Sequence, residues 1–191
     1  MNLIELFLSS ILNQNIALVF ILGMCPLIAI STNVKNAKGM GLAVILVVTV
    51  TAVINWPIYQ LLLATGTEKI ALLVFIITIA AVVQLLEIFM EKYVPAMYNA
   101  FGIFLPLITV NCVVLAVSLF FVNREYTFGQ TFSFSLGSGI GWALAILLVA
   151  GIREKMAKIS DLPRGLRGKA IVFIVLGILA LAFVGFTGII K

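Results

Sequence analysis

Long apolar runs, separated by short polar segments, follow one another along almost the whole chain. Most of these runs hold 18 or more residues with few charges, enough for a helix to cross a hydrocarbon core of about 30 Å. Polar segments such as Glu91 to Pro95, Asn123 to Gln130 and Arg153 to Lys169 are expected to be loops, and no soluble domain is expected. The predicted spans are, approximately, Leu3 to Ile30, Gly39 to Leu63, Ile70 to Met90, Met97 to Val122, Thr131 to Ile152 and Ala170 to Ile190.

Two short stretches of the chain match each other. Cys25-Pro-Leu-Ile-Ala-Ile-Ser31 lies in the first predicted span and Cys112-Val-Val-Leu-Ala-Val-Ser118 in the fourth. Because the two stretches are three spans apart, the second stretch crosses the membrane in the opposite direction to the first. The chain is therefore interpreted as a single transmembrane domain, 1–191, built from inverted repeats at about 1–90 and 97–191.

Helix-breaking residues accompany both cysteines. Asn13 to Asn15, Gly23 and Pro26 interrupt the first span, and Gly102 and Pro106 interrupt the fourth. Proline lacks a backbone donor and clashes with the preceding turn of a helix, so both cysteine-bearing helices are predicted to be broken. The fold class is thus an all-α polytopic membrane protein: six transmembrane helices in two inverted three-helix repeats, with helices one and four broken.

Composition agrees with a membrane protein and excludes several chemistries. Hydrophobic residues make up 63% of the chain and charged residues 10%, against about 25% charged residues in soluble domains. The chain has no histidine, which excludes histidine-ligated haem, histidine-bound zinc and a serine–histidine pair. The N-terminus lacks a basic segment, so no cleaved signal peptide is expected.

The basic residues predict an orientation. The first, third and fifth connections contain nine of the twelve Lys and Arg residues, and cytoplasmic loops collect Lys and Arg. Both termini are therefore expected on the outer side. The run Arg153 to Lys169 is interpreted as an anchor of this topology in preference to a lipid or nucleotide site. The net charge of +5 is explained in the same way, with no nucleic-acid partner expected.

Cys25 and Cys112 are the candidate metal ligands. A cysteine in an apolar span is commonly a small hydrophobic residue, whereas two at equivalent repeat positions also suit a disulfide, a redox pair or a metal site. Broken helices meet near the middle of the bilayer in inverted-repeat folds, so the two thiols could meet there. An iron–sulfur cluster needs four thiolates, so such a cluster would require two more from a partner.

Other polar residues also have a functional and a structural interpretation. Glu87 within the third span is a candidate for cation passage, because intramembrane carboxylates commonly face a cavity or a partner. It could instead reach the interface or pair with Lys92. Asn13 to Asn15 and Asn111 are expected to satisfy unwound backbone in preference to binding ions. The glycines of Gly137 to Gly141 predict close helix packing and not phosphate binding.

Several segments resemble one membrane-protein family. Leu22-Gly-Met-Cys-Pro26, Gly102 to Cys112 and Ala150-Gly-Ile-Arg-Glu-Lys-Met156 are similar to small membrane subunits of the sodium-translocating NADH:quinone reductase (Nqr) and of the related Rnf complex. The resemblance extends from about residue 5 to the C-terminus. Gly137-Ser-Gly-Ile-Gly-Trp142, with the run to Met156, is more similar to the E-type subunits of Nqr than to the A-type subunits of Rnf.

This resemblance implies a function. The family has six spans in two inverted halves, and the E-type subunit pairs with the homologous D-type subunit in a complex with A-, B-, C- and F-type subunits. By this likeness Cys25 and Cys112 bind half of an iron–sulfur centre, of the 2Fe-2S type, shared with the D-type subunit. The centre relays electrons across the bacterial inner membrane, and Glu87 matches an acidic position linked to sodium uptake. Both termini would be periplasmic. The NADH, flavin and quinone sites belong to other subunits, so no catalytic residue is expected here.

Three alternatives remain at this point. The chain could be the A-type subunit of the ion-translocating ferredoxin:NAD oxidoreductase Rnf, which a ferredoxin partner would reveal. It could be a small inverted-repeat secondary transporter, which uptake into liposomes would reveal. It could also be a structural subunit, in which case replacing both cysteines would leave electron transfer intact.

Overall fold

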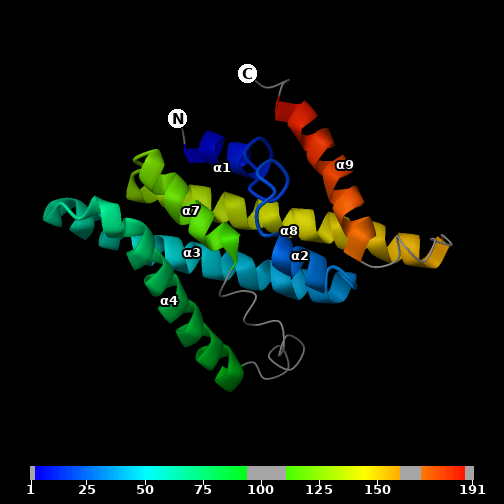
Figure 1. The fold of residues 1–191 in the computed structure, drawn as a ribbon, viewed down its shortest axis with the longest axis horizontal. Coiled ribbons are helices and arrows are strands. Elements are labelled where there is room, and N and C mark those ends of the chain that lie inside the picture. The colour runs from blue at the N-terminus through cyan, green and yellow to red at the C-terminus, as the bar shows by residue number, and fades with distance from the viewer. Residues whose placement is uncertain (1–2, 94–110, 160–168, 188–191) are drawn as a thin grey trace.

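The structure, a computed structural model, describes residues 3–93, 111–159 and 169–187. In these ranges every regular element is a helix, as the apolar pattern predicts (Figure 1). The elements are, in chain order, α1 (Leu3–Ile11), α2 (Met24–Ile30), α3 (Val34–Thr65), the short 3₁₀ helix η1 (Glu68–Ile70), α4 (Ala71–Tyr93), α7 (Cys112–Asn123), α8 (Phe128–Ile159) and α9 (Lys169–Thr187).

Three helices, α3, α4 and α8, are long and apolar enough to cross a membrane. Shorter apolar helical stretches occur at Cys112–Asn123 in α7 and at Ala170–Gly185 in α9. The chain is thus an α-helical polytopic membrane protein. The count of six spans remains a prediction, because much of the fourth span, including Gly102 and Pro106, lies outside the described residues.

The core is built on α3 and α8, each 32 residues long. They lie side by side and run in opposite directions (Figure 1). Small residues let their backbones approach: a methyl group added at Gly139 would lie 3.0 Å from Cα of Ile45, and one added at Gly41 would lie 3.0 Å from Cβ of Ala143. Close contact of this kind holds membrane helices together, since lipid is as apolar as the helix surface.

A second face of α8 receives α1 and the segment after it. A methyl group added at Gly137 would overlap Oγ of Ser10, and one added at Gly141 would lie 3.0 Å from Nδ2 of Asn15. These contacts confirm the prediction that the Gly137 to Gly141 run serves helix packing.

Helices α4 and α9 diverge from the α3–α8 pair on opposite sides of the view in Figure 1. Both carry large exposed apolar side chains, among them Ile77 and Leu85 on α4 and Ile178 and Leu181 on α9. A hydrocarbon environment accounts for such surfaces, because water would oppose their exposure.

The first predicted span is broken, as expected from its polar residues. Helix α1 ends at Ile11 and α2 begins at Met24, and residues 12–23 form turns. One detail of the expectation is wrong. Pro26 lies in the first turn of α2, where a missing backbone donor is tolerated because that donor has no partner within the helix. Pro26 therefore helps to begin α2, and the break precedes it.

Several segments expected to be loops are helical. Lys35 and Lys38 lie in α3, Glu91 to Tyr93 in α4, and Arg153 to Ile159 in α8, while α8 begins earlier than expected, at Phe128. Hydropathy marks only the apolar part of a helix, whereas Lys, Glu, Arg and Met favour helix as strongly as Leu does. Charged helix ends thus continue beyond the apolar part.

Candidate functional site

Both candidate ligands stand at the starts of helices. Cys25 is the second residue of α2, and Cys112 is the first residue of α7. Both thiols are free; Cys25 is exposed and Cys112 half-buried. The two matching sequence stretches therefore have matching local structure, with helix following directly from each cysteine.

These two helix starts lie next to each other in space. A methyl group added at Gly23, the residue before α2, would lie 2.5 Å from Cγ2 of Val113, which follows Cys112. It would also lie 2.5 Å from Nε1 of Trp142 on α8. Gly23 has a φ of +78°, a conformation that glycine adopts without the steric cost other residues incur. The structure thus brings together the segments that carry Cys25 and Cys112.

Helix α8 holds α2 at both ends. At its start, the fully buried Trp142 donates a hydrogen bond from Nε1 to the carbonyl oxygen of Gly23 at 3.4 Å. At its end, Arg153 donates to the carbonyl oxygen of Ile28 at 3.2 Å and to Oγ of Ser31 at 3.1 Å. A cation at a helix C-terminus also complements the helix dipole. These three hydrogen bonds hold α2, and with it Cys25, against α8.

The serine that ends each matching stretch accepts a hydrogen bond from the long helix of the other half. Ser31 accepts from Arg153 on α8, and Ser118 accepts at 2.9 Å from Nδ2 of Asn55 on α3. Both serines are buried. The cysteine-bearing helices α2 and α7 are therefore each attached to a long helix from across the proposed repeat boundary.

Asn15 organises the break between α1 and α2. Its Nδ2 donates to the carbonyl oxygens of Ile11 and Gly141, each at 3.0 Å, and its Oδ1 accepts from the backbone N–H groups of Ala17 and Leu18. Asn15 is fully buried. The expectation that these asparagines satisfy unwound backbone is confirmed for Asn15.

Asn111 has the same kind of role at the start of α7. It is the N-cap residue, and its Oδ1 accepts a hydrogen bond from the backbone N–H of Val113 at 3.1 Å. Asparagine is among the preferred residues at this position, because it satisfies a donor that has no partner within the helix. The residue before Cys112 thus fixes where α7 begins.

The donor set suits half of an iron–sulfur site. Thiolates are the usual ligands of such clusters, normally four in number, and the whole chain has two cysteines. Within the described ranges, no three residues of the types His, Cys, Asp and Glu gather where they could hold a metal ion. The exposed Cys25 leaves room for ligands from another chain. The two thiols fit a shared site and not a complete one.

Glu87 lies apart from the cysteines. It is half-buried in the C-terminal half of α4, and its Oε2 accepts a hydrogen bond from Nε2 of Gln84 at 3.4 Å. That half of α4 extends away from α2 and α7 (Figure 1). Any role of Glu87 in ion passage would therefore be performed at a place separate from the two thiols.

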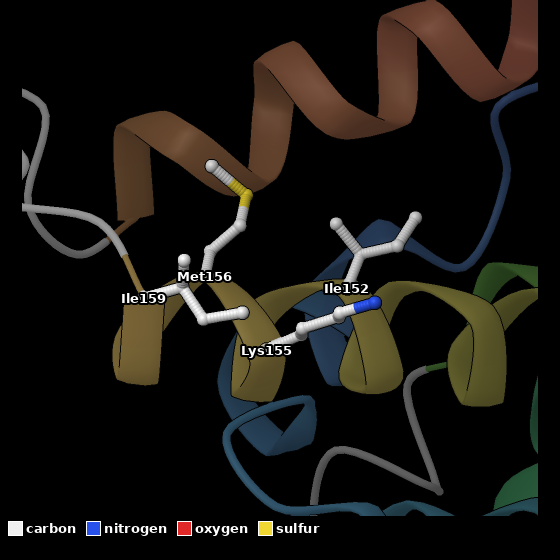
Figure 2. A pocket seen from close by; sticks show the side chains of 4 residues that line it. All are labelled: Ile152, Lys155, Met156 and Ile159. Atoms are coloured by element: carbon white, nitrogen blue, oxygen red, sulfur yellow. The ribbon is translucent and has the colours of Figure 1, made fainter.

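An apolar groove of 290 Å³ lies along the last turns of α8, on the side that faces α9 (Figure 2). Ile152, Lys155, Met156 and Ile159 line it, and the Met156 side chain rises from α8 toward α9 (Figure 2). Ile152 follows Trp142 by ten residues, about 15 Å along a helix. The groove is thus distant from the Trp142–Gly23 contact, and the described residues that line it include no thiol or carboxylate.

Sequence reasoning missed two residues that position the site. Both residues lie in the run from Gly137 to Met156 that carries part of the family resemblance, and Arg153 is also interpreted as part of a topological anchor. No sequence pattern predicts that either residue contacts α2. The contact of Trp142 with Gly23 depends on tertiary packing alone.

These features define a polytopic helical membrane protein in which two cysteines lie in the first turns of adjacent helices, one of them within a broken first span. A sequence model of the family described as "Rnf-Nqr subunit, membrane protein" matches residues 3–190. The chain therefore belongs to the Rnf-Nqr family of membrane subunits, as its motifs indicated.

Individual relatives are similar over nearly their full length. The chain is 48% identical to the E-type subunit of the Na(+)-translocating NADH-quinone reductase of Maridesulfovibrio salexigens over 199 residues, covering 98% of each chain. It is 49% identical over 197 residues to the protein of the same name from Methylococcus capsulatus, covering 97% of each. The protein of that name from Marinobacter nauticus is 47% identical over 197 residues, with 97% of each covered.

Proposed function

We propose that this chain is the E-type subunit of a sodium-translocating NADH–quinone reductase and works within that multi-subunit membrane complex. Relatives of this name match it at nearly half of all positions and from end to end. The family also includes Rnf subunits, and the E-type relatives favour the Nqr complex. Its enzymatic role is that of an oxidoreductase subunit that carries electrons between sites on other chains.

Within that complex, Cys25 and Cys112 bind half of an intramembrane iron–sulfur centre of the 2Fe-2S type. The observation that carries this proposal is the contact of Gly23 with Val113, which sets the two cysteine-bearing helix starts side by side. The homologous D-type subunit supplies the other two thiolates. Such a centre, when bound, accepts and releases single electrons. Trp142 and Arg153 hold α2 in place and so orient Cys25, while Asn111 fixes the start of α7 and so orients Cys112.

The two halves of the chain form an inverted repeat. Three observations support this: each cysteine lies in the first turn of a helix, each of these helices precedes a 32-residue helix, and each motif serine bonds to the long helix of the other half. In an inverted repeat of this kind, both cysteines are expected to lie near the repeat axis, where sites in such folds lie. The halves correspond to about 1–90 and 97–191.

The orientation proposed is with both termini on the periplasmic side of the inner membrane. The first turns of α3 and the last turns of α8 lie at the same end of the molecule (Figure 1). The first turns of α3 carry Lys35 and Lys38, and the last turns of α8 carry Lys155 and Lys158. Basic residues gathered at one end identify the cytoplasmic side by the positive-inside rule.

Electron transfer in cysteine variants of the intact complex tests the relay. In Cys25→Ala and in Cys112→Ala, NADH oxidation by an artificial electron acceptor is expected to continue, since the NADH site lies on another chain. Quinone reduction is expected to fall to background, because the electron path is interrupted inside the membrane. The measurement is stopped-flow absorbance of NADH and quinone. Quinone reduction at the wild-type rate in both variants would mean that the thiols serve packing.

Glu87 is proposed to take part in sodium uptake from one side of the membrane. In Glu87→Gln, sodium transport by the complex in liposomes is expected to need about tenfold more sodium for half-maximal rate, a loss of about 1.4 kcal/mol of affinity. The physical reason is removal of a half-buried negative charge. Glu91→Gln, on the exposed end of the same helix, is the matched control and should transport normally. Equal sodium dependence in both variants would exclude the role.

A further inference from the structure

Of the two polar side-chain atoms of Asn111, the oxygen has a hydrogen-bond partner among the described residues and the nitrogen has none. Its Oδ1 accepts from the backbone N–H of Val113 at 3.1 Å, so the capping contact itself determines which side-chain atom is the oxygen. Its Nδ2 is buried and has no hydrogen-bond partner in the part of the chain that the structure describes. The whole residue is only 2% exposed.

A buried amide nitrogen without an acceptor is unfavourable and uncommon in folded proteins. Asn15 provides the comparison within this chain, because both of its side-chain atoms are bonded. Capping of α7 explains the oxygen of Asn111 and leaves its nitrogen unexplained. Serine, threonine or aspartate would cap equally well without a buried amide donor. The amide at this position therefore indicates a hydrogen-bond acceptor for Nδ2 that is not among the described residues of this chain.

The neighbour of Asn111 indicates what this acceptor is. Cys112 follows directly, and Gly23, near Cys25, lies against Val113. Sulfur atoms bound to iron carry negative charge and accept hydrogen bonds from nearby N–H groups. An iron–sulfur centre bound by Cys25 and Cys112 would place such sulfurs next to the start of α7.

We propose that Nδ2 of Asn111 donates a hydrogen bond to a sulfur of the iron–sulfur centre, either the Cys112 thiolate or an inorganic sulfide. This inference rests on the proposed function. The hydrogen bond stabilises the reduced centre more than the oxidised one, because reduction adds negative charge to the sulfurs. Asn111 thereby raises the reduction potential of the centre.

The test is a redox titration of the centre, followed by electron paramagnetic resonance, in the intact complex. Asn111→Ser keeps an oxygen for the cap and removes the amide. In this variant the redox equilibrium of the centre is expected to shift about tenfold toward the oxidised state. For a one-electron couple, this corresponds to a midpoint potential lower by about 59 mV. The matched control is Asn123→Ser, which makes the same substitution at the exposed end of the same helix, α7; its midpoint should stay at the wild-type value.

A second measurement covers the case in which Asn111→Ser does not assemble. Pulsed resonance spectra of the wild-type complex, with ¹⁵N-labelled asparagine, are expected to show coupling of the centre to an asparagine nitrogen. Absence of that coupling, or an unchanged midpoint in an assembled Asn111→Ser complex, would overturn the inference alone. A full centre in Cys25→Ala and Cys112→Ala would instead overturn the proposed function.

Discussion

Gly23→Ala is expected to destabilise the chain by about 2–5 kcal/mol and to remove most of the proposed iron–sulfur centre. Two effects add. The left-handed backbone at Gly23, with φ +78°, costs an alanine about 1–2 kcal/mol. Its methyl group would lie 2.5 Å from both Val113 and Trp142, and overpacking a filled core costs about 1–3 kcal/mol. Separation of α2 from α7 would then move the two cysteines apart.

Gly66→Ala separates these two effects. Gly66 also has a positive φ, +69°, and a methyl group added there would meet nothing within 4 Å. This control is therefore expected to show the backbone cost alone, about 1–2 kcal/mol, and to keep the centre. The measurements are the thermal midpoint of the purified complex and its iron content. Equal losses in the two variants would mean that the Gly23 contact does not hold the helix starts together.

Asn15→Ala is the second variant with a large expected effect. It would leave two backbone carbonyls and two backbone N–H groups without their present partner. Each buried polar group left unpaired costs about 1–3 kcal/mol, so a total loss of about 3 kcal/mol or more is expected. Asn123→Ala, at the exposed end of α7, is the control and should be near neutral.

Hydrogen–deuterium exchange locates the Asn15 effect within the chain. Residues 12–23 are expected to exchange much faster in Asn15→Ala than in wild type, because Asn15 bonds the first part of this break to α8. The contact of Trp142 with Gly23 at the end of the break would remain. Protection of α3 should be unchanged by the substitution. Unaltered exchange over residues 12–23 would show that the break is held by other contacts.

Polar and small residues inside apolar runs predicted the features that local chemistry determines. Asn15 in a hydrophobic run implied irregular backbone, and the glycines around Gly139 implied close helix contact; both are observed. Polar residues within a membrane span commonly pair with backbone groups, since unsatisfied backbone is not tolerated in lipid. Small residues there commonly allow helices to pack closely.

Features that depend on distant contacts were not predictable from the sequence. The composition of the first span predicts that Pro26 breaks a helix, yet Pro26 lies in a first turn, because the rule for proline depends on where the helix begins. The ends of α3, α4 and α8 extend past the apolar runs, since charged residues favour helix as well as apolar ones do. The hydrogen bond of Arg153 to Ser31 joins residues far apart in sequence, which no local pattern records.

The proposed shared metal centre requires that Cys25 and Cys112, at the paired helix starts, are both ligands. Its most direct test is the iron and acid-labile sulfide content of the purified complex, with electron paramagnetic resonance, in wild type, Cys25→Ala and Cys112→Ala. Ile28→Val, a small change on the same helix as Cys25, is the control. We expect the same single cluster signal to be lost in both cysteine variants and to be retained in the control. A full set of clusters in either cysteine variant would contradict it.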